Sequence, residues 1–371
     1  MNQVNPWLKE SQYMGSLSPA CRMCAKGVKM VLLITGLCNA DCFYCPLSKR
    51  KLGKDRIFAN EWELENENDV DKLIKEAEYI EATGAGITGG DPLLVWKRTE
   101  KYITLLKDTF GSDFHIHLYT SGTKNSKHIN DLVSAGLDEI RFHPPHRFWN
   151  NMIASPSYLS IKKALETDVD VAIEIPAIPS LEKEMFFLVS WANEMGVKWI
   201  NLNELEFSET NADELNEIGF TVKDDISSAV KGSQEAAYAV IYGSLNEDFD
   251  IGVHYCSSAF KDGIQLKNRI KRRARNVAKK FDIITDEGTL LKGVIYPKKM
   301  SLKELQNLLK KEYRISNKKL FLNEEKNRIE IPIWKLEKIA SNLKKQGFEC
   351  YLIEEYPTAD SLEVERTPLP L

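Results

Sequence analysis

The stretch from Met30 to Pro46 reads MVLLITGLCNADCFYCP, an apolar run followed at once by three cysteines. The run predicts a buried strand, and Cys38, Cys42 and Cys45 follow it with the spacing C-x3-C-x2-C. Three thiolates on one short loop suit three irons of a [4Fe–4S] cluster, for which cysteine is the usual ligand. The fourth iron would then have no protein ligand and would be open to a substrate.

A second motif, Gly89-Gly90-Asp91-Pro92, ends the next apolar stretch, Ala85–Thr88. Two glycines allow close approach of another backbone and unusual φ angles, and proline stiffens the exit from the turn. Such a turn is common by itself. Because it ends the next predicted strand after the cysteine loop, we expect it to belong to the same site.

These two motifs resemble those of the radical S-adenosylmethionine (SAM) superfamily, in which an aromatic residue, here Tyr44, precedes the last cysteine. The resemblance covers residues 21 to about 210 and points to an archaeal-type branch related to pyruvate formate-lyase activating enzyme. It implies that SAM chelates the open iron of the cluster. The reduced cluster then cleaves SAM, giving a 5′-deoxyadenosyl radical that abstracts a hydrogen atom from a substrate.

The resemblance also implies roles for particular residues. Cys38, Cys42 and Cys45 would hold the cluster, and backbone carbonyls of the turn Gly89–Pro92 would bind the amino group of SAM. Asp91 stands where the family usually has glutamate, one methylene longer. This departure matters little if the backbone makes the contact.

Other cysteines raise the question of a second metal site. Cys21-x2-Cys24 precedes the loop, and five of the seven cysteines fall within residues 21–45. A CxxC pair followed by further cysteines is also typical of a zinc site, and ordinary buried thiols are the simplest alternative. Cys256, beside His254, is either a small core residue or a third ligand with Cys21 and Cys24, for an auxiliary iron–sulfur cluster or zinc.

Strand and helix patterns alternate from residue 29 to about 207 and predict an α/β fold. Apolar, β-branched strands followed by helices indicate a parallel sheet covered by helices. Six such units match a partial (β/α)6 radical SAM barrel, which the resemblance also implies. The predicted strands are 29–35, 85–90, 114–121, 139–144, 170–178 and 199–207, and the predicted helices are 71–82, 98–109, 126–135, 157–166 and 181–195.

Binding sites in such folds lie at the carboxyl ends of the strands. Polar residues at these strand ends are therefore further candidates for the site. Ser121 ends the third strand, and the run Tyr119–Gly122 resembles a Thr-Asn-Gly strand end of activating-type relatives. Glu174 and Asn203 lie on the fifth and sixth strands. We predict that Ser121, Glu174 and Asn203 contact SAM, the alternative being polar residues already satisfied in the core.

The rest of the sequence predicts a basic helix and a smaller C-terminal domain. Residues 267–280 contain eight Lys or Arg at amphipathic helical spacing, which indicates a solvated face or a dock for phosphates. After residue 285 the predicted order βαββαβ, with a capping box at Ser301 and Glu304, is that of a ferredoxin-like α+β domain. The predicted division is an N-terminal extension 1–28, a core 29–210, a helical or irregular segment 211–284 and a C-terminal domain 285–371.

Composition sets outer limits on function. A net charge of −4 predicts no overall attraction to nucleic acid or membranes. The sequence shows no signal peptide and no apolar run that could span a membrane, and clustered cysteines favour a reducing cytoplasm. We therefore predict a cytoplasmic radical SAM enzyme served by a flavodoxin- or ferredoxin-type electron donor.

The substrate is open at this level. It could be RNA, which the basic helix favours, or a protein glycine, as for a glycyl-radical-enzyme activase. A zinc- or cluster-stabilised binding protein without turnover is the alternative of another class.

Overall fold

The computed structural model describes residues 3–225 and 227–370 and consists of two compact units, Met1–Leu266 and Lys267–Leu371. This division differs from the predicted one at both ends of the core. Residues before 29 and between 211 and 266 supply strands to the sheet of the first unit, and the basic helix belongs to the second unit. Hydrogen bonds between strands distant in sequence cause the difference.

In the described part of the first unit, eleven strands form one sheet whose seven central strands are parallel. Six of these seven strands were predicted. In spatial order the parallel strands are β11 (Gly252–Cys256), β10 (Trp199–Glu204), β9 (Asp170–Ala177), β8 (Glu139–Phe142), β7 (His115–Thr120), β6 (Gly84–Thr88) and β3 (Lys29–Leu33).

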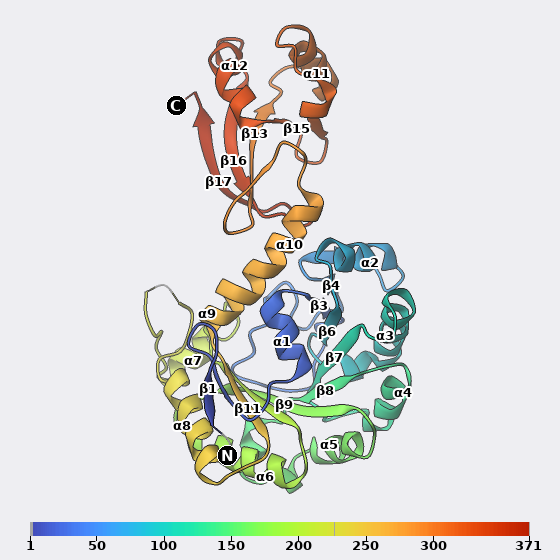
Figure 1. Ribbon diagram of the computed structural model, residues 1–371, viewed down its shortest axis with the longest axis vertical. Helices are drawn as coiled ribbons and strands as arrows, with labels where there is room; N and C mark the ends of the chain where they lie inside the picture. Colours follow the sequence, from blue (N-terminus) through green and yellow to red (C-terminus); the bar gives the residue numbers. More distant parts are fainter. Residues whose placement is uncertain (1–2, 226, 371) are drawn as a thin grey trace. The chain divides into compact units, whose positions relative to one another are not determined.

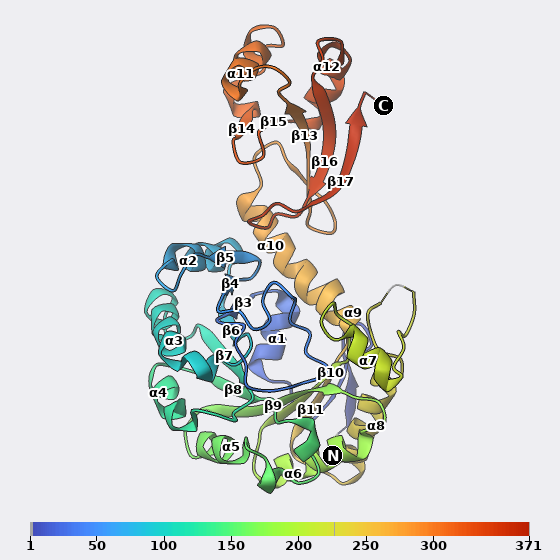
Figure 2. The ribbon, with the colours of Figure 1, turned by 180° about the vertical axis from the view of Figure 1, so that it is seen from behind.

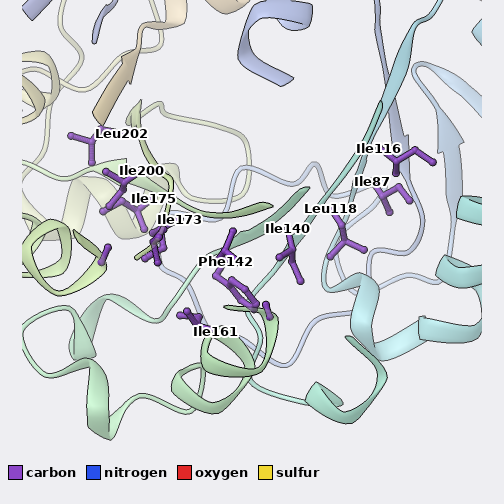
Figure 3. Close-up of a cluster of buried hydrophobic side chains, with 14 of the residues drawn as sticks. Ile87, Ile116, Leu118, Ile140, Phe142, Ile161, Ile173, Ile175, Ile200 and Leu202 are labelled. Carbon is purple, nitrogen blue, oxygen red and sulfur yellow. The ribbon is translucent and has the colours of Figure 1, made fainter. Parts of the chain in front are cut away.

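The helices between these strands lie outside the curved sheet (Figure 1). Alternate strand residues point to opposite faces, and one residue in two is aliphatic or aromatic and packs toward the helices (Figure 3). The five predicted helices are confirmed with small shifts at their ends. They are α2 (Val70–Tyr79), α3 (Trp96–Phe110), α4 (Ile129–Ser134), α5 (Tyr158–Leu165) and α6 (Glu182–Glu194).

Helix α1 (Pro19–Lys26) lies on the inner, concave side of the sheet (Figures 1 and 2). Ser18 caps its first turn, accepting a hydrogen bond from the Cys21 N–H, and Gly27 ends it in the left-handed conformation. The inner sheet residues are polar, because the alternation that sends Ile140 and Phe142 outward turns Arg141 inward. The CxxC pair is therefore held inside the sheet, not on a separate extension.

Strand β11 was missed by the sequence analysis. It has only five residues, Gly252–Cys256, and pairs in parallel with β10, so that His254 lies opposite Asn201 and Cys256 opposite Asn203. The edges of the sheet carry short antiparallel strands that were not predicted. They are β1 (Val4–Pro6), β2 (Gln12–Met14), β4 (Ile57–Ala59) and β5 (Trp62–Leu64).

The second unit begins with the basic helix α10 (Lys267–Val277) and continues as an antiparallel sheet with two helices. The sheet order is β14-β15-β13-β16-β17, and β12 pairs with β13. The predicted capping box at Ser301 and Glu304 is present. The other elements of this unit are β12 (Ile283–Ile284), β13 (Leu290–Tyr296), α11 (Leu302–Lys311), β14 (Phe321–Asn323), β15 (Arg328–Ile331), α12 (Ile333–Lys345), β16 (Glu349–Glu355) and β17 (Glu363–Leu369). Strands β12 and β17 were not predicted.

Within the described residues, we find no helix with the length and apolar character needed to cross a membrane.

Candidate functional site

The turn Gly89–Pro92 is hydrogen-bonded to the base of the cysteine loop. The N–H of Gly90 donates to the Thr35 carbonyl and that of Asp91 to the Leu37 carbonyl, each at 2.8 Å. A Cβ on Gly90 would lie 2.1 Å from the Leu37 oxygen, and Gly89, with φ +144°, comes equally close to Thr35. Only glycine permits this approach, so the two motifs form one structure.

The Asp91 side chain connects this turn to the end of β7. It is buried and accepts from the Leu93 N–H at 3.0 Å and the Thr120 hydroxyl at 2.6 Å. Its other oxygen accepts from the Ser121 hydroxyl and, at 3.3 Å, from the Ser121 N–H. The Asp91 carboxylate thus stabilises the turn, and the Ser121 hydroxyl is already bound to it.

The three cysteines of the loop lie near its surface, with Cys38 exposed and Cys42 and Cys45 half-buried. Burial raises the pKa of the Cys42 thiol to about 11; a hydrogen bond from Tyr44 opposes this, while the charges of Cys38 and Cys45 add to it. Within residues 3–225 and 227–370, no three His, Cys, Asp or Glu side chains are grouped to hold a metal ion by themselves.

Contacts that the sequence analysis did not predict hold the loop on the inner side of the sheet. The Tyr44 hydroxyl lies 3.0 Å from Nε2 of His143, whose Nδ1 lies 2.7 Å from the Glu174 carbonyl oxygen. Thr210 donates to the Cys45 carbonyl at 3.0 Å, and Asn211 donates to the Tyr44 carbonyl at 3.2 Å. His143 directly follows the end of β8, at the edge of the sheet where site residues are expected, whereas no local pattern marks Thr210 and Asn211.

Glu174, a predicted SAM contact, lies at the centre of a buried polar network. Its carboxylate accepts from Asn203 at 2.8 Å, from Asn201 at 2.9 Å and from Arg141 at 2.5 Å. Burial raises the pKa of Glu174, but the charge of Arg141 and the two amides outweigh burial and lower it. Asn203, another predicted SAM contact, thus touches Glu174, whereas Ser121 contacts Asp91 instead.

Cys21, in the CxxC pair of α1, contacts two members of this network. Arg141 donates to Cys21 Sγ at 3.5 Å and Asn201 at 3.3 Å. Burial would raise the pKa of Cys21, but the charge of Arg141 and the neighbouring His254 lower it to about 5. Burial raises the pKa of Cys24 to about 12, with a further rise caused by the charge of Cys21.

Cys256 belongs to the same neighbourhood. Burial raises its pKa, the charge of Lys261 opposes the rise, and the charges of Cys21 and Cys24 add to it. The structure places His254 opposite Asn201, which donates to Cys21, and Cys256 opposite Asn203 on the same pair of strands. Like the loop cysteines, Cys21, Cys24 and Cys256 are not grouped within the described residues for a single ion.

Comparison with known proteins agrees with the geometry. A radical SAM superfamily model matches residues 32–145. A protein of Methanocaldococcus jannaschii, named as a candidate glycyl-radical enzyme activating enzyme, is 40% identical over 388 residues, covering 100% of this chain and 96% of the relative. This chain belongs to the radical SAM superfamily.

Other matches to this radical SAM protein are partial. A Methanococcus maripaludis (strain C6) protein named as a candidate GTP 3′,8-cyclase is 30% identical over 148 residues, 38% of this chain and 45% of the relative. The crystal structure of Streptococcus suis SuiB bound to S-adenosylmethionine aligns with a TM-score of 0.43 and 10% identity, over 62% of this chain and 50% of that one. Residues 288–369 match a domain of unknown function (DUF8061).

The family's cofactors are a [4Fe–4S] cluster and SAM, and the residues present are compatible with both. The cysteine loop supplies three thiols, the ligand type that iron–sulfur clusters use. The turn Gly89–Pro92 lies against the base of that loop. A radical SAM enzyme needs these two elements side by side.

Proposed function

We propose that Cys38, Cys42 and Cys45 ligate the [4Fe–4S] cluster and that the turn Gly89–Pro92 positions SAM on its open iron. The observation that carries this proposal is the pair of backbone hydrogen bonds joining the turn to residues 35 and 37, directly before Cys38. When bound, the cluster supplies the electron that cleaves SAM to methionine and a 5′-deoxyadenosyl radical. The substrate, from which the radical takes hydrogen, is unidentified.

The predicted SAM contacts have unequal support. Glu174 is held by Arg141, Asn201 and Asn203, so its carboxylate is fixed and its negative charge is favoured. We propose that Glu174 and Asn203 bind polar groups of SAM as a pair. Ser121 would then act through Asp91, with its hydroxyl orienting the turn.

Other parts of the proposal concern architecture and setting. We propose a partial (β/α)6 barrel for the first unit, supported by its curved parallel strands (Figure 2). We propose a ferredoxin-like α+β fold for the second unit, supported by the order β14-β15-β13-β16. A cytoplasmic location and a flavodoxin- or ferredoxin-type electron donor remain proposals that rest on the clustered cysteines and the family.

The proposed function is tested with protein purified under anaerobic conditions. With dithionite and SAM, the unmodified chain should be brown and should form 5′-deoxyadenosine. The Cys42→Ala variant should form 5′-deoxyadenosine at least about 100-fold more slowly than the unmodified chain, because an electron reaches SAM only through the cluster. Cys350→Ser, in the second unit, is the matched control. A colourless, zinc-loaded chain that leaves SAM intact would reject the proposal.

A second candidate, glycyl-radical activation, is favoured by the name of the 40% identical relative. The substrate would then be a backbone glycine of a partner protein, and hydrogen abstraction would leave a persistent radical there. Electron paramagnetic resonance of a co-expressed candidate partner would show a glycyl doublet that depends on Cys42. If tRNA binds instead, with a steep salt dependence that Lys271→Ala reduces, an RNA substrate becomes the better choice.

A further inference from the structure

Three cysteines have no role in the proposed SAM site: Cys21, which is buried, and Cys24 and Cys256, which are half-buried. Cys21 and Cys24 are three residues apart in α1, so they lie on one face of the helix. His254 and Cys256 are two residues apart in β11, so they point to the same side of the sheet. A helix and a strand that meet inside one sheet thus each present two residues of the types that bind iron or zinc.

We infer that Cys21, Cys24, Cys256 and His254 bind a second iron–sulfur cluster of the [4Fe–4S] type. His254 provides evidence that is independent of the cysteines. It is only 3% exposed, and in the described part of the chain its Nε2 has no hydrogen-bond partner. Since buried polar atoms are nearly always satisfied, an unpartnered imidazole nitrogen beside Cys21 indicates a ligand that binds there.

The surrounding charges suit a cluster held by several thiolates. Arg141 and Asn201 donate hydrogen bonds to Cys21, the positive charge of Arg141 also acts on Cys24, and that of Lys261 acts on Cys256. Each thiol therefore has a cation nearby. Cations and hydrogen bonds to sulfur stabilise negative clusters and set their reduction potential.

The spacing favours a cluster over zinc. Four ligands of one zinc ion, each about 2.3 Å from it, must lie within about 4 Å of one another, and no such group occurs among the described residues. In a cluster each thiolate binds a different iron, so the sulfurs stand farther apart.

The position of this second site suggests how it relates to the first. Arg141 and Asn201 contact both Cys21 and the Glu174 carboxylate. The Glu174 carbonyl contacts His143, which in turn contacts Tyr44 of the cysteine loop. A continuous chain of polar contacts therefore joins the two cysteine groups.

Iron and sulfide counts, made on the full chain after anaerobic reconstitution, test the inference. The unmodified protein should hold about eight irons, and the triple variant Cys38→Ala, Cys42→Ala, Cys45→Ala should keep about four, because each [4Fe–4S] cluster carries four. Cys21→Ser with Cys256→Ser should also keep about four and still cleave SAM at a measurable rate. Cys350→Ser is the control and should keep all eight.

Electron paramagnetic resonance separates the two clusters. In the loop triple variant the remaining reduced cluster should show a signal that SAM does not change, whereas SAM should alter the signal of the Cys21/Cys256 variant. His254→Ala should shift the paramagnetic resonance signal of the second cluster, while the protein keeps all of its iron. Because this variant retains every cysteine, it tests the role of His254 even if the cysteine variants fold poorly. If the chain does not cleave SAM but the inference is right, the signal of the second cluster should still be observed. Iron that disappears completely from a folded loop triple variant, or zinc without sulfide at the second site, would overturn the inference.

Discussion

Replacing Asp91 by alanine should destabilise the first unit, because its carboxylate joins the ends of two strands. Asp91 is 1% exposed and accepts four hydrogen bonds, two from hydroxyls and two from the N–H groups of Leu93 and Ser121. The hydroxyls can rotate toward other acceptors, but the N–H groups cannot. Since each of the two unsatisfied buried donors costs about 1–3 kcal/mol, we expect Asp91→Ala to lower the free energy of unfolding by about 2–6 kcal/mol.

Urea unfolding followed by circular dichroism measures this loss, with Asp108→Ala as the control. Asp108 is exposed on α3, and its replacement should change the free energy of unfolding by less than about 0.5 kcal/mol. Asp91→Glu restores the residue usual in the family but adds a methylene to a buried site, which should cost about 1–3 kcal/mol. A loss below about 1 kcal/mol for Asp91→Ala would show that the carboxylate does not hold the turn.

Three further outcomes are expected. Gly90→Ala should separate the turn from the cysteine loop, because the new Cβ would lie 2.1 Å from the Leu37 oxygen. The rate of SAM cleavage should then fall more than about tenfold. The control Gly263→Ala, where the nearest atom would lie 3.6 Å from the Cβ, should leave that rate unchanged. Tyr44→Phe removes the partner of His143 Nε2 and should lower stability by about 1–2 kcal/mol; an unchanged urea midpoint would contradict the contact. Burial raises the pKa of Glu330, but the charges of Lys292 and Lys279 outweigh it and hold that pKa at about 2, below the ordinary 4.5. Its charge therefore stabilises the second unit above pH 4.5, and about 3 kcal/mol should be lost as the pH falls toward 2; Glu330→Gln should show a flatter acid unfolding profile, and equal profiles would refute this assignment.

Local patterns in the chain were sufficient for much of the fold. The capping box at Ser301 and Glu304 was predicted and is present, because apolar runs and caps act over a few residues. Strand β11 was missed because it is short and alternates with His254 and Cys256. Nothing local distinguishes such a segment from a loop, and only its pairing with β10 makes it a strand.

The motif at residues 38–45 and the turn at 89–92 determined the superfamily, since spacing along one loop is a local property that sequence records directly. The tertiary structure decided which distant residues share the interior. Asp91 accepts a hydrogen bond from Ser121, and Cys21 contacts Arg141 and Asn201, the latter lying opposite His254 in the sheet. These pairings depend on strand order and on the placement of α1 inside the sheet, and both are set by long-range hydrogen bonds and packing that no window of sequence contains.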